Sequence, residues 1–181
     1  MFQRRNQQLV LDRISQVLDA TAEGHAEHLT KLFDAARHIF IAGAGRSRLV
    51  GSFLAMRLMH AGYGVSLVGE IVTPSLSSGD LLLVISGSGE TEQLVAFAKR
   101  AGVLGADVVL ISANTDSTLA ELSTVVFQIG TADLYDTVQG MPMGTVFELS
   151  ALCFLEALIS HIIWDKGIPE EEMRSRHANL E

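Results

Sequence analysis

The amino-acid sequence predicts an α/β fold built as a three-layer sandwich, in which a five-stranded parallel sheet lies between two layers of helices. Short apolar segments that run into glycine or serine recur along the chain and are typical of buried strands. Because these segments are apolar throughout rather than alternating, we expect a parallel sheet that is covered on both faces. The predicted strands comprise residues 38–42, 65–68, 81–85, 108–112 and 124–129.

Predicted helices separate the strands and continue beyond them at both ends of the chain. Their apolar residues recur at helical spacing. A pair of helices over about residues 7–36 breaks near Gly24, further helices span about 47–60, 90–101 and 143–164, and a charged helical tail covers about 169–181. No segment rich in proline, glycine or serine divides the chain, so we expect residues 1–181 to form a single domain.

The composition predicts a globular core, and the net charge excludes some classes of binding partner. Of the 181 residues, 48% are hydrophobic and 19% are charged, which supplies enough apolar material for a core. The formal net charge is -8. Nucleic acids and anionic membrane surfaces bind cationic faces, so neither is an expected partner. An anionic small ligand remains compatible with this charge if local donors hold it.

The only cysteine is Cys153, so no intramolecular disulfide can form and a reducing, cytoplasmic location is expected. Cys153 lies on an apolar helix face, where we expect it to be buried and inert. Glu156 and His161 interrupt the apolar segment 151–164, so no membrane-spanning helix is expected. The segment 1–11 lacks the long apolar core of a signal peptide.

The first candidate binding loop is Gly43-Ala44-Gly45-Arg46-Ser47, between the first predicted strand and its helix. Glycines here allow a positive φ and a close approach of a ligand to the backbone. Ser47 stands where the helix is expected to begin. Its hydroxyl therefore either caps that helix or binds an anion beside the free N–H groups.

Three interpretations of this loop remain open: a plain strand-to-helix turn, an anion site and a dinucleotide site. For the dinucleotide site, Gly43 and Gly45 begin the glycine fingerprint, and Glu70 follows the second strand where a ribose-binding acid would stand. However, Arg48 occupies the position of the third glycine. A bulky side chain there would hinder the close packing of helix on strand that the glycine permits.

The second candidate loop, Ser86-Gly87-Ser88-Gly89-Glu90-Thr91, follows the third predicted strand. Three hydroxyls and two glycines in six residues can form a compact nest of uncharged donors around a phosphate group. The lysine of a nucleoside-triphosphate loop is absent. An ordinary capped turn, with Ser88 or Gly89 as the cap and Glu90 in the first helical turn, would need only one hydroxyl. The loop therefore favours a phosphate site.

Together the two loops resemble those of the sugar isomerase (SIS) domain, which has a flavodoxin-like fold. Three further segments make the chain similar to the 6-phospho-3-hexuloisomerase family within that superfamily, namely Ala55–His60, Met141–Glu148 and Arg176–Leu180. The similarity covers nearly the whole chain. Arg48 and Thr145 depart from the family, some of whose members have a smaller residue and a serine at these positions.

The resemblance implies an enzyme that interconverts D-arabino-3-hexulose 6-phosphate and fructose 6-phosphate in the ribulose monophosphate pathway, without a metal or other cofactor. It also implies a homo-oligomer, either a tetramer or a dimer. By the same resemblance, the residues that contact the phosphate are Ser47, Ser86, Ser88 and Thr91, and further substrate-binding positions are Gly45, Arg46 and Gly87. The resemblance also implies that Glu148 is the catalytic base and that His177 is a functional histidine.

The residues themselves are compatible with this chemistry. Moving a ketone from C3 to C2 removes a proton from C2, passes through a 2,3-enediolate and returns a proton at C3, and one carboxylate beside both carbons can serve both steps. Glu148 is the candidate, although a glutamate at a helix N-terminus is also favoured by the helix dipole alone. Arg46 is a candidate donor to the enediolate oxygens; it can equally pair with the phosphate or with a surface acid.

Other features point to a second copy of the chain. His177 lies in a charged tail, EEEMRSRHANLE, with too few apolar residues to hold itself in place. It completes a binding site only if the tail docks on a neighbouring subunit. The predicted helix 143–164 is apolar around much of its circumference, whereas a surface helix needs a single apolar stripe. We expect at least a dimer.

His60, at the end of the helix 47–60, is interpreted as a core or capping residue.

Two other functions would use the same loops. One is an isomerase of a different phosphosugar, and the other is a non-catalytic module that binds a phosphosugar. The acid at Glu148 favours an enzyme, and no DNA-binding segment of a regulator is recognisable.

Overall fold

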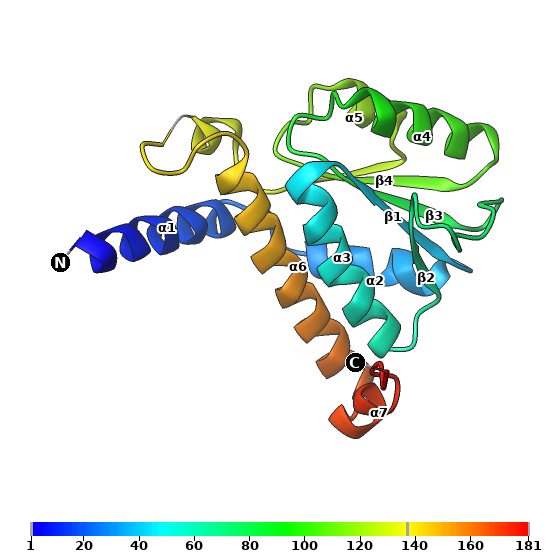
Figure 1. Cartoon of the computed structure of the whole chain (residues 1–181). Coiled ribbons are helices and arrows are strands. Elements are labelled where there is room, and N and C mark those ends of the chain that lie inside the picture. The colour runs from blue at the N-terminus through cyan, green and yellow to red at the C-terminus, as the bar shows by residue number, and fades with distance from the viewer. Residues whose placement is uncertain (1, 137, 181) are drawn as a thin grey trace.

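The computed structural model describes residues 2–136 and 138–180 and arranges them around one parallel sheet (Figure 1). The two ends of the predicted domain, Met1 and Glu181, and Thr137 lie outside the described residues. The strands follow the order β2-β1-β3-β4-β5, and each neighbouring pair is parallel. Their bounds are β1 Ile39–Gly43, β2 Val65–Leu67, β3 Leu81–Ile85, β4 Asp107–Ser112 and β5 Val125–Gln128.

This strand order is that of flavodoxin-like folds, in which the direction of winding reverses between β1 and β3. The predicted fold class is therefore confirmed. Each predicted strand is present, with its ends shifted by at most about one residue, a difference within the usual uncertainty of boundaries.

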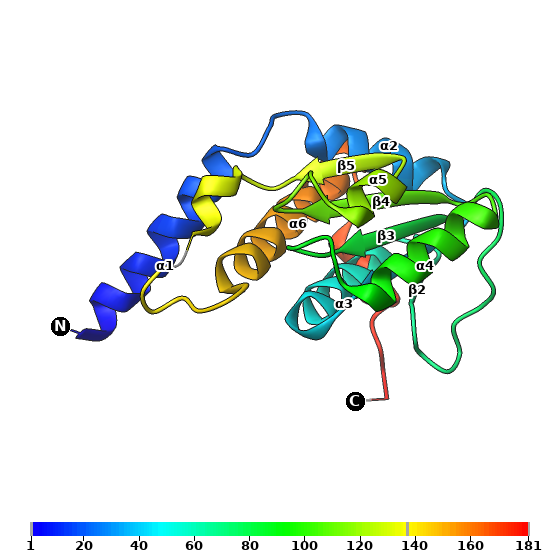
Figure 2. The same cartoon turned by 90° about the horizontal axis from the view of Figure 1, so that it is seen from above.

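Helices cover both faces of the sheet (Figure 2). Their bounds are α1 Phe2–Asp19, α2 His25–Ala35, α3 Gly45–His60, α4 Glu92–Val103, α5 Thr118–Leu122, α6 Thr145–Lys166 and α7 Glu170–Ser175, with a short 3₁₀ turn at Ala132–Tyr135. The chain breaks between α1 and α2 at Gly24, which has a φ of 82°. This agrees with the break predicted there.

The helix prediction was wrong at both ends of the chain and missed one short helix. The first helix begins at Phe2 rather than near residue 7, since the polar residues of its first turns show no apolar periodicity. In the figures these turns extend away from the sheet (Figures 1 and 2). The tail is helical only over α7 and ends at Ser175. The short α5, which lies between β4 and β5, was not predicted at all.

The core has two parts, one on each face of the sheet, because neighbouring strand residues point to opposite sides. Ile39, Ile41 and Leu83 pack with α2, α3 and α6. Phe40 and Leu82 pack with α4 and α5. Burial on both faces explains why the strands are apolar throughout.

α6 is the central helix of the thicker helical layer and packs against α1, α2 and α3. By length and composition alone it is long and apolar enough to cross a membrane, contrary to the sequence expectation, and 44% of its most apolar window is buried inside the fold. The core helix of a soluble protein has the same character. Packing within this fold accounts for the inward part of its apolar surface.

Two glycines test how tightly the helices pack. A Cβ at Gly43 would lie 2.9 Å from backbone atoms of Ser47 and Arg48, whereas one at Gly102, inside α4, would meet nothing within 4 Å. We expect Gly43→Ala to lower the free energy of unfolding by about 1–3 kcal/mol, because the first turn of α3 must move away from β1. Gly102→Ala should raise it by about 0.5–1 kcal/mol. Urea unfolding curves measure both, and a Gly43→Ala protein of unchanged stability would contradict the tight turn.

Candidate active site

The two candidate loops lie side by side because β1 and β3 are neighbours, with Gly43 opposite Ile85 at their carboxyl ends. In sheets of this topology, ligands bind in the crevice beyond the carboxyl ends of the strands at which the order reverses. A cavity of about 240 Å³ opens at this point. It is lined by Ala44, Ser47, Ile85, Ser86, Gly87, Ser88, Thr91, Leu94, Gly144, Phe147 and Glu148.

In the first loop, Ser47 is not the helix cap that one interpretation required. α3 already begins at Gly45, and Ala44 occupies the capping position without a side-chain hydrogen bond. Ser47 therefore lies in the first turn, where its hydroxyl makes no hydrogen bond to any described residue. Gly45 has a φ of 54° and faces open space. The first turn of α3 thus presents uncommitted donors to the cavity, as an anion site requires.

In the second loop, the serine hydroxyls accept hydrogen bonds from the loop itself. Ser86 Oγ accepts from the N–H of Gly89 at 3.2 Å, and Ser88 Oγ accepts from the N–H of Glu90 at 3.3 Å. A hydroxyl has one proton to donate as well as lone pairs to accept with. Because these bonds use the oxygens only as acceptors, both protons remain available for a ligand.

The capped-turn interpretation of the second loop was wrong in its details. The residue before the first turn of α4 is Thr91, not Ser88 or Gly89, and its side chain makes no capping bond. Glu90 lies outside the helix. Its carboxylate accepts from the N–H of Thr118 at 2.7 Å and from the Thr118 hydroxyl at 2.8 Å, and these bonds lower the pKa of Glu90.

Glu148 reaches the same cavity from the first turn of α6. A Cβ at Gly87 would lie 2.9 Å from the ring of Phe147, so only a glycine lets this turn approach the second loop so closely. The Glu148 side chain is 15% exposed and forms an ion pair with Arg46, whose side chain is 59% exposed. Sequence reasoning did not anticipate that these two candidates would pair with each other. The pair places a carboxylate and a cationic donor together at the rim of the cavity.

Gly144 and Phe147 line the cavity but were not singled out as site residues. Both belong to the segment Met141–Glu148, so the similarity contained them without indicating a role. Their importance comes from packing. A Cβ at Gly144 would come within 3.1 Å of Oε1 of Glu148, so a glycine at this position leaves room for the carboxylate. A contact of this kind leaves no pattern in the sequence.

The dinucleotide interpretation of the first loop is not supported. Arg48 forms an ion pair with Glu70 at 2.5 Å. The acid that would have held a ribose is therefore paired with the residue that replaces the third glycine.

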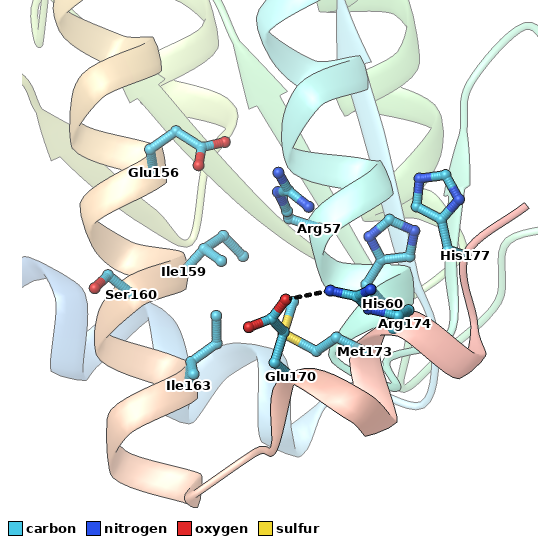
Figure 3. Close-up of a pocket in the computed structure, with 10 residues that line it drawn as sticks. All are labelled: Arg57, His60, Glu156, Ile159, Ser160, Ile163, Glu170, Met173, Arg174 and His177. Carbon is cyan, nitrogen blue, oxygen red and sulfur yellow. Dashed lines mark hydrogen bonds and ion pairs between the residues drawn. The ribbon is translucent and has the colours of Figure 1, made fainter.

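His177 lies away from this cavity. It stacks on His60 with ring centroids 5.2 Å apart, at the other end of α3. His60 lies 14 residues after Arg46 in α3, which corresponds to about 21 Å along the helix axis. Figure 3 shows the separate cavity that both histidines line, of about 590 Å³, together with Arg57 and Glu156. Within one chain, His177 and Glu148 do not share a site.

The tail is anchored more firmly than its composition predicted. Arg176 donates to the backbone carbonyl of His60 at 2.9 Å and pairs with Glu172 at 2.5 Å. His60 itself is buried, as the core interpretation required. The hydrogen bond of Arg176 and the stacking of His177 on His60 thus hold the tail against the end of α3.

Cys153 is exposed, so its predicted burial was wrong. It lies on the outward face of α6, where apolar composition did not reveal which side faces the core. Partial desolvation and the nearby Glu156 carboxylate raise the pKa of its thiol.

The sequence model of the SIS domain family matches residues 31–155. The chain belongs to this family. The match spans both loops, the whole sheet and the first half of α6, and thus includes every residue that lines the cavity at the loops.

More specific similarity comes from individual relatives. The chain is 52% identical to a 3-hexulose-6-phosphate isomerase of Methylomonas aminofaciens, over 97% of this chain and 98% of the relative. It is 38% identical to the 3-hexulose-6-phosphate isomerase of Bacillus subtilis, over 86% of each chain. A crystal structure from Methanococcus jannaschii, from which a molecular function of 3-hexulose-6-phosphate isomerase has been inferred, superposes with a TM-score of 0.87 at 32% identity, covering 98% of this chain and 99% of the other.

The buried His60 predicts a pH dependence of stability. Burial lowers its pKa below the ordinary value of 6.5, and the neighbouring His177 and Arg57 lower it further. The unfolded chain therefore binds this proton more readily than the folded chain does. The stability that neutral His60 contributes is complete above about pH 6.5 and is lost as the pH falls through the folded-state pKa.

We expect the urea midpoint of the unmodified protein to fall between about pH 7.5 and pH 5.5, and to fall less in His60→Gln. His25, whose pKa burial also lowers, is common to both proteins and cancels in the comparison. If the urea midpoint falls equally in the two proteins, the pKa of His60 is not lower in the folded chain than in the unfolded chain.

Proposed function

We propose that this protein is a 3-hexulose-6-phosphate isomerase, which interconverts D-arabino-3-hexulose 6-phosphate and fructose 6-phosphate. The observation that carries the proposal is the shared cavity, in which the hydroxyls of Ser47, Ser86, Ser88 and Thr91 and the carboxylate of Glu148 come together. The relatives that bear this name, at up to 52% identity, support the choice of substrate. We also propose that residues 1–181 act as one domain, in the cytoplasm and in the ribulose monophosphate pathway.

The phosphate group binds to the second loop and the first turn of α3. A dianion needs several donors, and uncharged hydroxyl and amide groups at helix N-termini supply them. Such donors suit a chain with a net charge of -8, because they hold the anion locally without a cationic surface.

Glu148 acts as the catalytic base. Its carboxylate removes the proton from C2, the electrons of that bond form the C2–C3 double bond, and the C3 carbonyl becomes an enolate oxygen. After a proton passes from O2 to O3, the same carboxylate returns its proton to C3, which leaves the ketone at C2. Arg46, which pairs with Glu148, then donates to the oxygens on which negative charge develops; that pairing supports the role, because it holds the guanidinium beside the base.

This assignment predicts that Glu148→Gln removes turnover and leaves substrate binding within a few fold. Loss of a general base costs about 10²–10⁴ in rate, and the phosphate donors are unchanged. The assay supplies formaldehyde, ribulose 5-phosphate and a hexulose phosphate synthase and measures fructose 6-phosphate. Glu92→Gln is the matched control, since Glu92 is also in a first helical turn but is exposed and makes no ion pair with a described residue.

Equal losses of binding and turnover in Glu148→Gln would count against the base role. Absence of product from the unmodified protein, with phosphosugar binding retained, would instead favour a non-catalytic module or a different phosphosugar.

We further propose that the enzyme is a homo-oligomer, a tetramer or a dimer, in which a neighbour completes each site. An apolar groove between α3 and α6 begins at the Arg46–Glu148 pair and continues along Leu49, Phe53 and Leu152. Leu49, Phe53 and Met56 are exposed and lie on one face of α3. Solvent-exposed apolar residues grouped in this way are typical of subunit interfaces.

The position of Phe53 suggests how the partner is oriented. It lies midway between Arg46 and His60 along α3. Two copies that pack about a two-fold axis at Phe53, with antiparallel α3 helices, would bring the His60–His177 stack of one subunit to the Arg46–Glu148 pair of the other. This arrangement would give His177 access to a site that it does not reach in its own chain.

Phe53→Glu tests the interface. Burying two opposed carboxylates is unfavourable, so we expect this variant to have a lower mass in solution and to lose turnover about as strongly as His177→Asn. Val103→Glu is the control, because Val103 is an exposed apolar residue at the end of α4, on the opposite helical layer. Sedimentation and the coupled assay measure both effects. Dissociation without loss of turnover would show that the site is complete within one chain.

A further inference from the structure

Three consecutive carbonyl groups of the second loop are held by residues 112–119, which run from the last residue of β4 into the first turn of α5 (the β4–α5 segment). The Ser112 hydroxyl donates to the Gly87 carbonyl at 3.3 Å, and the Asn114 side-chain amide donates to the Ser88 carbonyl at 3.3 Å. The N–H of Leu119 donates to the Gly89 carbonyl at 3.0 Å. All three carbonyls of this turn therefore point toward the β4–α5 segment.

The orientation of the carbonyls sets that of the amides. A peptide unit is planar and trans, so its N–H points opposite to its C=O. The N–H groups of Ser88, Gly89 and Glu90 consequently point away from the β4–α5 segment. Those of Gly89 and Glu90 bind the serine hydroxyls, and that of Ser88 makes no hydrogen bond within the described residues. Turning the carbonyls away also removes three partial negative charges from the neighbourhood of a bound anion.

Asn114 is well suited to this task. Its own side-chain oxygen accepts from the N–H of Asp116 at 2.9 Å, and its side-chain nitrogen donates to the Asp116 carbonyl at 3.0 Å as well as to the Ser88 carbonyl. The two bonds to the Asp116 backbone fix the amide group so that its nitrogen faces the Ser88 carbonyl. A side chain fixed in this way loses little freedom when the loop binds a ligand.

We propose that Asn114 is a positioning residue for the phosphate site: by holding the Ser88 carbonyl it turns the second loop so that the loop's donors face the phosphate group. This inference rests on the proposed function, because the proposed function has the phosphate group bound at the second loop. Asn114 does not line the cavity. It acts only through the loop.

The chain offers a charge-neutral test. In the double variant Asn114→Asp/Asp116→Asn the net charge is unchanged and position 114 keeps an oxygen that accepts from the N–H of residue 116. The donor to the carbonyls of Ser88 and residue 116 is lost. Asp116→Asn alone is the control, because the Asp116 side chain is exposed and makes no bond to a described residue. We would measure KM and kcat for D-arabino-3-hexulose 6-phosphate, the inhibition constant of inorganic phosphate and the melting temperature.

The loss of one such hydrogen bond corresponds to about a 5- to 10-fold change in affinity. We expect the double variant to raise KM and the phosphate inhibition constant in parallel by this factor, with kcat within about two-fold and the control unchanged. A purely structural role would lower the melting temperature and the active fraction but leave both constants in place, which would overturn the proposal. If the double variant does not fold, Asn114→Ala, which removes the same donor without adding a charge, should raise both constants in the same direction; unchanged constants would likewise overturn the proposal.

Ser88→Ala separates this inference from the function on which it rests. A raised phosphate inhibition constant in Ser88→Ala with none in the double variant would refute only the role of Asn114. Unchanged constants in both would show that the phosphate binds elsewhere, and the proposed site would fall with the inference.

Discussion

β1 and β3 pair in parallel over five residues, from Ile39 opposite Leu81 to Gly43 opposite Ile85. The two strands are separated in the chain by α3 and β2, and the winding of the sheet reverses between them. At such a point the loops that follow the two strands diverge to opposite faces of the sheet and leave a crevice. Each feature of the candidate site depends on this pairing, because it alone brings a loop at residues 43–47 beside a loop at residues 86–91.

The crevice is closed on its third side by α6. The contact between Gly87 and the ring of Phe147 determines how near the helix can come, and with it how near Glu148 lies to the donors of the second loop. The loop is in turn held from behind by the β4–α5 segment, through its carbonyl groups and the Glu90 carboxylate. The site is therefore assembled from one rigid edge of the sheet and two packed elements, which is the arrangement that keeps uncharged donors pre-oriented for an anion.

Electrostatics explains why the pocket takes this form. The chain carries a formal net charge of -8, and the cations nearest the site, Arg46 and Arg48, are each paired with a glutamate. A phosphate bound as proposed would then be held by backbone and hydroxyl dipoles, which are short-range and directional. Arg48 also pairs with Glu70, the acid that a ribose would need in a dinucleotide site.

Much of this was determined by the sequence alone. The continuous apolar strands, with glycine and serine at their ends, predicted the fold, the strand boundaries and the two loops, because burial and turn geometry act over a few neighbouring residues. Similarity to a known family then indicated Glu148. The tertiary structure decided what depends on distant segments: that Glu148 pairs with Arg46, that Asn114 supports the second loop, that Cys153 is exposed, and that His177 lies at the far end of α3 from Glu148. Contacts between residues far apart in the chain follow from how helices pack on the sheet, and packing of this kind leaves no local periodicity from which to predict it.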